Sequence, residues 1–292
     1  MKHIFIINPT AGKADGFDLL RVIYSVCLMN GNDFDFEFTN SIGDATKLAK
    51  KNALENKQCI VYSVGGDGTL NEVVNGIVNT DAILGILPFG SGNDFFRMLS
   101  DTKIDIISRT INGFIDETNI GYANKTHFIN IASLGYDAEV AVNASIMKQH
   151  KLIPNDMIYY ASIFYTLLSY KFPNVKISFN DVDLEQKITL LAICNGKYYG
   201  NGIPIAPTAN YKDNLFNICL ADKINKARIP FLLTKVLKGE HESFNFVHTY
   251  QSDYIKAEAE QPISCNVDGE TFTSDSFEFG IVKNKMKVLK PR

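Results

Sequence analysis

Up to about residue 110, short apolar runs alternate with stretches that have helical spacing. Ile4–Ile7 is continuously apolar and Ile60–Val64 is rich in β-branched residues, as expected of strands buried on both faces. Phe34–Thr39 alternates apolar and polar side chains, which predicts a half-exposed strand, and the apolar positions of Leu70–Ile77 are spaced as in a helix. The further elements predicted here are a helix after Gly12, a helix over Ser41–Asn52, a strand over Ile83–Pro88 and a helix from Phe95. This alternation predicts a doubly wound α/β domain.

The pattern of apolar and polar residues changes from about Ile120. Short strand-like runs are separated there by polar turns such as Asn180-Asp181. Two helical insertions interrupt them, at Asp156–Tyr170 and Arg228–Leu237. Regular short strands of this kind are typical of an antiparallel sandwich or barrel. The sequence therefore predicts two domains, an α/β domain over residues 1–120 and a β-rich domain over residues 121–292.

Gly65-Gly66-Asp67-Gly68 stands between a predicted strand and a predicted helix. Glycine lets the backbone approach a ligand closely, and Thr69 can cap the helix that follows. The N-terminus of a helix attracts anions, but Asp67 is itself an anion, so a cation is needed between it and a phosphate. The turn therefore favours a Mg²⁺-nucleotide. The alternative is a structural glycine turn.

Two further glycine-containing turns follow predicted strands, at Asn8–Gly12 and at Phe89–Asp94. Lys13 adds a cation beside the first of them, and Asp94 is either a helix cap or a support for a metal or base. In a doubly wound sheet such turns gather outside the carboxyl ends of the strands, where ligands bind. The turns match neither G-x-G-x-x-G nor G-x-x-x-x-G-K-[ST], which argues against a dinucleotide or Walker site.

Composition narrows the function classes. The 292 residues carry a net charge of -3, which gives no electrostatic reason to expect binding to nucleic acid. The five cysteines show no C-x-x-C pair and suggest a reduced, cytoplasmic protein. The apolar stretch Met157–Tyr170 is shorter than the roughly 20 residues of a membrane span, so at most peripheral contact with a membrane is expected.

A series of motifs gives the chain a resemblance to the diacylglycerol kinase catalytic-domain family, and specifically to its bacterial soluble lipid-kinase branch. The motifs occur in the family's order over almost the whole chain. They are N-P-T-A-G from Asn8, G-G-D-G-T-L-N-E from Gly65, L-P-F-G-S-G-N-D-F from Leu87, S-L-G-Y-D from Ser133, N-G-K-Y-Y-G-N-G from Asn195, A-P-T-A from Ala206 and V-D-G-E from Val267.

The resemblance implies a fold shared by NAD kinases and diacylglycerol kinases, with a C-terminal β-sandwich and a cleft between the domains. It implies ATP- and Mg²⁺-dependent phosphorylation of a lipid with a free hydroxyl, such as diacylglycerol to phosphatidate in phospholipid metabolism. The proton acceptor would be Asp268 or Glu270, and the sequence does not decide between them. By matching positions, nucleotide contacts would fall on Asn8, Pro9, Thr10, Ala11, Gly12, Thr39, Gly65, Gly66, Asp67, Gly68, Thr69, Leu70, Asn71 and Ser91.

The resemblance also implies a second Mg²⁺ site in the β-rich domain, formed by Asp213 with carbonyl oxygens of Asn210 and Leu215. The chain departs here from the usual D-D-G-x-L pattern, because Lys212 replaces an acid and Asn214 replaces the glycine. The loop therefore has one acid where the usual pattern has two.

Two alternatives remain open. One is an NAD kinase-like phosphotransferase, which shares the G-G-D-G core, and the other is a catalytically silent regulator that binds nucleotide or lipid. No histidine has a metal-ligand spacing such as H-E-x-x-H, so zinc chemistry is not expected. The sequence does not identify the lipid, and it leaves open whether the protein forms a homodimer.

Overall fold

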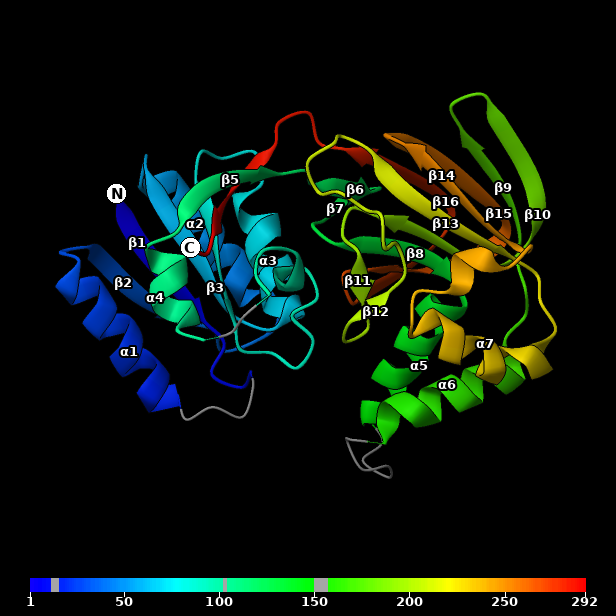
Figure 1. Ribbon diagram of the computed structural model, residues 1–292, viewed down its shortest axis with the longest axis horizontal. Coiled ribbons are helices and arrows are strands. Elements are labelled where there is room, and N and C mark those ends of the chain that lie inside the picture. Colours follow the sequence, from blue (N-terminus) through cyan, green and yellow to red (C-terminus); the bar gives the residue numbers. More distant parts are fainter. Residues whose placement is uncertain (12–15, 102–103, 150–156) are drawn as a thin grey trace.

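The computed structural model describes residues 1–11, 16–101, 104–149 and 157–292, which form two halves side by side (Figure 1). Both termini lie in the α/β half. Gly12 and Lys13 of the first predicted turn lie outside the described residues. The predicted order, an α/β half followed by a β-rich half, is confirmed.

Six strands form the first sheet in the order β2-β1-β3-β4-β17-β5. They are β1 (Lys2–Ile7), β2 (Asp33–Phe38), β3 (Cys59–Gly65), β4 (Ile83–Pro88), β5 (Phe114–Thr118) and β17 (Met286–Lys290). The first four strands pair in parallel, as predicted, and β5 is antiparallel to β17. The carboxyl ends of the parallel strands therefore meet at one edge of the sheet.

Successive side chains of β1 pack on opposite faces of the sheet, each face covered by its own apolar cluster, which explains why the sequence of this strand is apolar throughout. Ile4 and Ile6 pack with one buried cluster, and Phe5 and Ile7 pack with another on the opposite face. The helices that supply these clusters are α1 (Gly16–Met29), α2 (Asp44–Glu55), α3 (Asp67–Ile77) and α4 (Ile106–Ile111). Helices α2 and α3 contribute to the first cluster and α1 to the second.

The second sheet has nine strands, in the order β14-β13-β10-β8-β15-β16-β6-β7, with β9 pairing with β10 and β15. Strands β8 and β9 both pair with β10 and with β15, at different places along these two long strands. The strands are β6 (Gly121–Ala123), β7 (Thr126–Phe128), β8 (Ile131–Gly135), β9 (Asn174–Phe179), β10 (Val182–Cys194), β13 (Phe216–Asp222), β14 (Val247–Ser252), β15 (Tyr254–Val267) and β16 (Glu270–Ile281). A short hairpin, β11 (Tyr198–Tyr199) with β12 (Ile203–Pro204), forms a separate sheet.

Three helices, α5 (Tyr136–Gln149), α6 (Ile158–Ser169) and α7 (Ile229–Val236), lie together at one end of the β-rich half (Figure 1). The last two match the predicted insertions. Helix α5 was not expected, because its sequence has no clear apolar stripe and its β-branched positions Val140 and Val142 alternate as in a strand. Among the described residues, no helix is long and apolar enough to cross a membrane.

The structure corrects two sequence-based expectations about element positions. The predicted helix from Phe95 is only a 3₁₀ turn, η1 (Phe96–Met98), and regular helix resumes at Ile106. The C-terminal strand β17, which the division at residue 120 assigns to the β-rich half, pairs instead with β4 and β5. Val288 and Leu289 of β17 are buried in the two clusters on opposite faces of the first sheet, which explains why this strand occupies an interior position.

Candidate active site

The turns that follow β3 and β4 pack directly on each other. The carbonyl oxygen of Gly65 accepts hydrogen bonds from the backbone N–H groups of Phe89 and Gly90, at 2.8 and 3.0 Å. A Cβ atom on Gly90 would lie 2.3 Å from the Cα atom of Gly66. Glycine is therefore required here for the close approach of two backbones.

Asp67 fixes the second of these turns. Its carboxylate accepts hydrogen bonds from the backbone N–H groups of Asn93 and Asp94, both at 2.8 Å. Gly92 is needed beside it, because a Cβ atom there would lie 2.6 Å from Oδ2 of Asp67. The carboxylate is only partly buried and lines a cavity, so it holds the loop while still facing open space.

Residues of the first turn reach the same edge of the sheet. Asn8 donates a hydrogen bond from Nδ2 to Oγ1 of Thr69, at 3.2 Å, and accepts one from the backbone of Thr10. Thr39, after β2, donates its backbone N–H to the carbonyl oxygen of Ile7. Thr69 does not cap α3, since its hydroxyl is engaged by Asn8 and the N-cap residue is Gly66. The turns after β1, β3 and β4 therefore lie together at this edge of the sheet, as predicted.

The residues predicted to contact nucleotide fall into two groups. Gly65, Thr69, Leu70 and Asn71 are buried. Leu70 belongs to a core cluster, and Asn71 donates hydrogen bonds to the carbonyl oxygen of His127 and to Asp268. Those at or near the surface along this edge, among the described residues, are Asn8, Pro9, Thr10, Ala11, Thr39, Gly66, Asp67, Gly68 and Ser91.

Asp94 connects the two halves of the molecule. Its carboxylate accepts hydrogen bonds from the backbone N–H groups of Asn201, at 3.1 Å, and Gly202, at 2.7 Å, in the β11–β12 turn. Burial raises the pKa of Asp94, and the nearby Asp67 carboxylate raises it further. Arg97 lies 3.7 Å away and partly offsets this effect. Asp94 therefore anchors the β-rich half rather than capping a helix.

Asp268 and Gly269 form the two-residue turn between β15 and β16. Both have positive φ, 50° and 98°, as in a type I′ hairpin turn. The Asp268 carboxylate accepts hydrogen bonds from the backbone N–H groups of Ile129 and Ile131, at 2.8 Å each, and of Asn130, at 3.2 Å. Its oxygens are thus already occupied by donors.

Burial raises the pKa of Asp268 to about 6, although these backbone amides and Asn71 favour its ionised form. Taking up a proton would place an O–H group against N–H donors and break these contacts. Glu270, the other candidate proton acceptor, is exposed at the first position of β16 and makes no hydrogen bond or ion pair through its carboxylate with the described residues. The two acids therefore have different environments.

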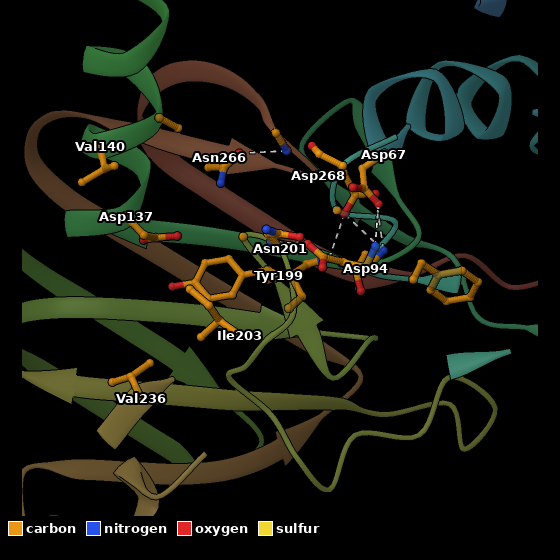
Figure 2. Close-up of a pocket in the computed structure, with 18 of the residues that line it drawn as sticks. Asp67, Asp94, Asp137, Val140, Tyr199, Asn201, Ile203, Val236, Asn266 and Asp268 are labelled. Atoms are coloured by element: carbon orange, nitrogen blue, oxygen red, sulfur yellow. Dashed lines mark hydrogen bonds between the residues drawn. The ribbon is translucent and has the colours of Figure 1, made fainter. Parts of the chain in front are cut away.

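A cavity of about 330 Å³ extends from Asp67, Asp94 and Asp268 into the β-rich half, and Glu270 is not among the residues that line it. Figure 2 shows Asp67, Asp94 and Asp268 together at one end and Val140 and Val236 at the other. The apolar wall comes from α5, α6, α7 and β12, and includes Val140, Ala141, Ile163, Ile203, Ile229 and Val236. The cavity thus has a carboxylate-rich end and an apolar end.

The acidic end is compatible with a cation that accompanies a nucleotide. Asp67 and Asp94 are close enough for the charge of one to raise the pKa of the other, and a cation would relieve this repulsion. Carboxylate oxygens are the ligands that Mg²⁺ prefers. Among the described residues, however, no group of three His, Cys, Asp or Glu side chains is arranged to hold a metal by itself.

At the second predicted metal site, two of the expected ligand groups already accept local hydrogen bonds. Asp213 Oδ1 accepts a hydrogen bond from the backbone N–H of Leu215, and the Asn210 carbonyl oxygen accepts one from that of Asp213. Lys212 forms an ion pair with Asp116 of β5, at 2.5 Å, and Lys285 donates a hydrogen bond to the Lys212 carbonyl oxygen. The loop itself offers one carboxylate, with two lysines beside it, and a metal there stays a prediction.

Sequence reasoning missed two parts of the site. The β11–β12 turn lies in the motif N-G-K-Y-Y-G-N-G, whose glycines and asparagines were a signal for a turn close to another backbone. Asp137 also lines the cavity, and its position after a buried strand in S-L-G-Y-D was the available signal.

Replacing Asp268 by Asn should destabilise the protein by about 2–4 kcal/mol, because an amide group offers fewer acceptors and sets its own N–H₂ against the donors of residues 129–131. Urea unfolding monitored by circular dichroism measures this change. Asp275→Asn, an exposed acid on the same hairpin, is the matched control and should change stability by less than about 0.5 kcal/mol. Equal midpoints for the two variants would contradict the structural role of Asp268.

Comparisons with known proteins agree with this architecture. A family model described as the diacylglycerol kinase catalytic domain matches residues 2–123, and one described as the YegS C-terminal NAD kinase beta sandwich-like domain matches residues 130–290. A diacylglycerol kinase of Bacillus subtilis is 30% identical over 276 residues, covering 92% of this chain and 90% of that protein. One from Staphylococcus epidermidis is 31% identical over 276 residues, covering 91% of this chain and 84% of that protein.

The fold has also been seen in solved structures. The crystal structure of a diacylglycerol kinase from Bacillus anthracis is similar with a TM-score of 0.72 at 21% identity, covering 99% of this chain and 96% of that chain. Sequence and structure therefore agree over nearly the whole length, and the chain belongs to the diacylglycerol kinase family of lipid kinases.

Proposed function

We propose that the protein transfers the γ-phosphate of Mg²⁺-bound ATP to the hydroxyl group of a lipid, with diacylglycerol as the reference acceptor and phosphatidate as the product. The observation that carries this proposal is the cavity, which joins the glycine turns of the α/β half to an apolar space in the β-rich half. A phosphate donor at the first end and an acyl chain at the second would meet at the acids between them.

The nucleotide would lie along the edge formed by the turns after β1, β3 and β4. Gly66, Gly68 and Ser91 offer backbone and hydroxyl groups for phosphate oxygens there. Asp67 and Asp94 would hold the Mg²⁺ that accompanies the phosphates, which offsets the charge of the transferred group. This role is consistent with the raised pKa of Asp94, which reflects burial and the neighbouring Asp67 carboxylate. No step requires a cation in the Asp213 loop.

Glu270 is the proposed proton acceptor. The lipid hydroxyl oxygen forms a bond to the γ-phosphorus, the bond from that phosphorus to the β–γ bridging oxygen breaks, and the hydroxyl proton passes to the Glu270 carboxylate. Asp268 is less suited to accept it, because its oxygens already receive backbone hydrogen bonds. We assign Asp268 a positioning role, since it holds the hairpin that carries Glu270.

The outer faces of α6 and α7 support transient association with a membrane. Phe164, Leu168 and Phe231 are exposed by 64%, 66% and 67%, and Ile163 and Ile229 of the same helices line the cavity. Helices α6 and α7 lie side by side, since Lys226 next to α7 donates a hydrogen bond to the Leu168 carbonyl oxygen (Figure 1). Basic side chains in and around α7 that would favour an anionic surface are Lys223, Lys226, Arg228, Lys235 and Lys238. A lipid could then pass from the bilayer to the cavity between these helices.

Purified protein incubated with labelled ATP, Mg²⁺ and lipids in mixed micelles should transfer phosphate to a lipid hydroxyl. Glu270→Gln should lower turnover at least about 100-fold, the usual cost of removing a general base, without changing the unfolding midpoint. Glu258→Gln, an exposed acid on the partner strand β15, is the matched control and should keep wild-type turnover. Transfer to NAD and to no lipid would overturn the proposal, and wild-type turnover in Glu270→Gln would remove that residue from the mechanism.

The double variant Phe164→Ser/Leu168→Ser should bind vesicles of phosphatidylglycerol and phosphatidylcholine roughly ten-fold more weakly, because two apolar side chains no longer enter the interface. Cosedimentation with the vesicles measures the binding. Leu28→Ser removes an exposed leucine from α1 in the other half and should bind as the wild type does. Equal binding by all three proteins would exclude this face as the membrane contact.

A further inference from the structure

Asp137 is an acid that the proposed mechanism does not use, although it lines the same cavity. It follows the fully buried strand β8 and lies in the first turn of α5. Gly135 between them has φ 115°, and a Cβ atom there would lie 2.5 Å from the carbonyl oxygen of Thr189. The local backbone therefore requires glycine, and this tight turn brings Asp137 to the wall of the cavity.

One oxygen of Asp137 is engaged and the other is not. Ser133 donates a hydrogen bond to Oδ2. Oδ1 is buried and has no hydrogen-bond partner among the described residues. A buried acceptor without a donor costs about 1–3 kcal/mol, so a ligand that supplies a donor would gain much of this free energy back. Because Asp137 lines the cavity, a molecule bound there can supply the missing donor.

The charge state of Asp137 decides which ligand groups it favours. Burial raises its pKa to about 6, against the opposing effects of the Ser133 hydroxyl and of the nearby backbone N–H groups of Ala138 and Asp137. The ionised form therefore still predominates at neutral pH. An ionised carboxylate accepts hydrogen bonds and donates none, so its partner must be a hydroxyl or N–H group.

Asp137 also lies apart from the reacting end of the cavity. Figure 2 shows it on the side of Val140, with Asp67, Asp94 and Asp268 across the cavity. A lipid whose hydroxyl is at the acids and whose chain lies among Val140, Ile163 and Val236 would pass close to it. The cavity thus offers a second polar contact beside the apolar wall.

We propose that Asp137 determines the acceptor class by accepting, at Oδ1, a hydrogen bond from a second donor group on the lipid, a hydroxyl or an N–H. This inference rests on the proposed function and makes it more specific. A diacylglycerol whose single hydroxyl lies at the acids has no second donor and offers Asp137 only ester oxygens, with which a carboxylate forms no hydrogen bond. A monoacylglycerol has a second hydroxyl, and a ceramide has an amide N–H and a second hydroxyl.

The test compares kcat/KM for oleoyl-matched monoacylglycerol, ceramide and diacylglycerol in the same mixed micelles. Asp137→Ala should lower kcat/KM for at least one of the two lipids with a second donor by about ten-fold or more, mainly through KM. It should leave the value for diacylglycerol within two-fold. A loss with monoacylglycerol alone would identify a hydroxyl as the donor, and a loss with ceramide alone would identify its amide N–H.

Asp137→Asn keeps the side-chain size and repeats the test if the alanine variant does not fold. Its neutral amide oxygen is a weaker acceptor, so we expect a smaller loss of the same sign. Glu139→Gln is the matched control, because Glu139 is on the same helix, bonds to Ser264 and does not line the cavity. Glu139→Gln should leave kcat/KM for all three lipids unchanged.

The selectivity is kcat/KM for monoacylglycerol or ceramide divided by that for diacylglycerol. If it differs from the wild-type value by less than two-fold in both Asp137 variants, the inference is overturned while the lipid kinase function stays intact. Phosphorylation of no lipid by the wild-type protein would instead overturn the proposed function and this inference with it.

Discussion

The site depends on one kind of interaction, a carboxylate that accepts backbone N–H groups of a neighbouring loop. Asp67 holds the turn after β4, and Asp94 in that turn holds the β11–β12 turn of the other half. Asp268 in turn holds the segment that enters β8. Each carboxylate accepts hydrogen bonds from backbone N–H groups of a loop or turn, which helix or sheet hydrogen bonds do not satisfy. Together they join both halves of the molecule around one cavity, because charge-assisted hydrogen bonds in a partly buried site are among the stronger contacts available.

This arrangement separates acids that look alike in the sequence. Asp268 and Glu270 lie two residues apart in one hairpin, yet Asp268 is saturated with backbone donors and Glu270 is exposed. The same hairpin therefore supplies a positioning residue and an acid that remains able to take up a proton. Asp137 differs from both, since one of its oxygens is buried without a partner.

Much of the fold could be predicted from local pattern. Strands β1 and β3 are buried on both faces, and their sequences are accordingly largely apolar, whereas β2 alternates because one of its faces is more exposed. The glycines of the turns are needed for close backbone contacts such as that of Gly66 with Gly90. The convergence of the turns after β1, β3 and β4 follows from parallel strand order.

The remaining features depend on contacts between distant segments, which periodicity does not encode. The donors to Asp268 come from residues 129–131, far away in the sequence, so nothing near Asp268 distinguishes it from an exposed turn residue. The interior position of β17 likewise depends on two strands distant in the chain. At Lys212 the sequence did carry a signal, because a lysine stands where the usual pattern has an acid, and this lysine forms an ion pair with Asp116.

The most direct test of this account is amide hydrogen exchange, measured by NMR, in the wild type and in Asp94→Asn. If the Asp94 carboxylate holds the β11–β12 turn, the amides of Asn201 and Gly202 should exchange about ten-fold faster in the variant, while those of β1 and β3 stay unchanged. Unchanged exchange at Asn201 and Gly202 would contradict the claim that these carboxylates join the two halves of the site.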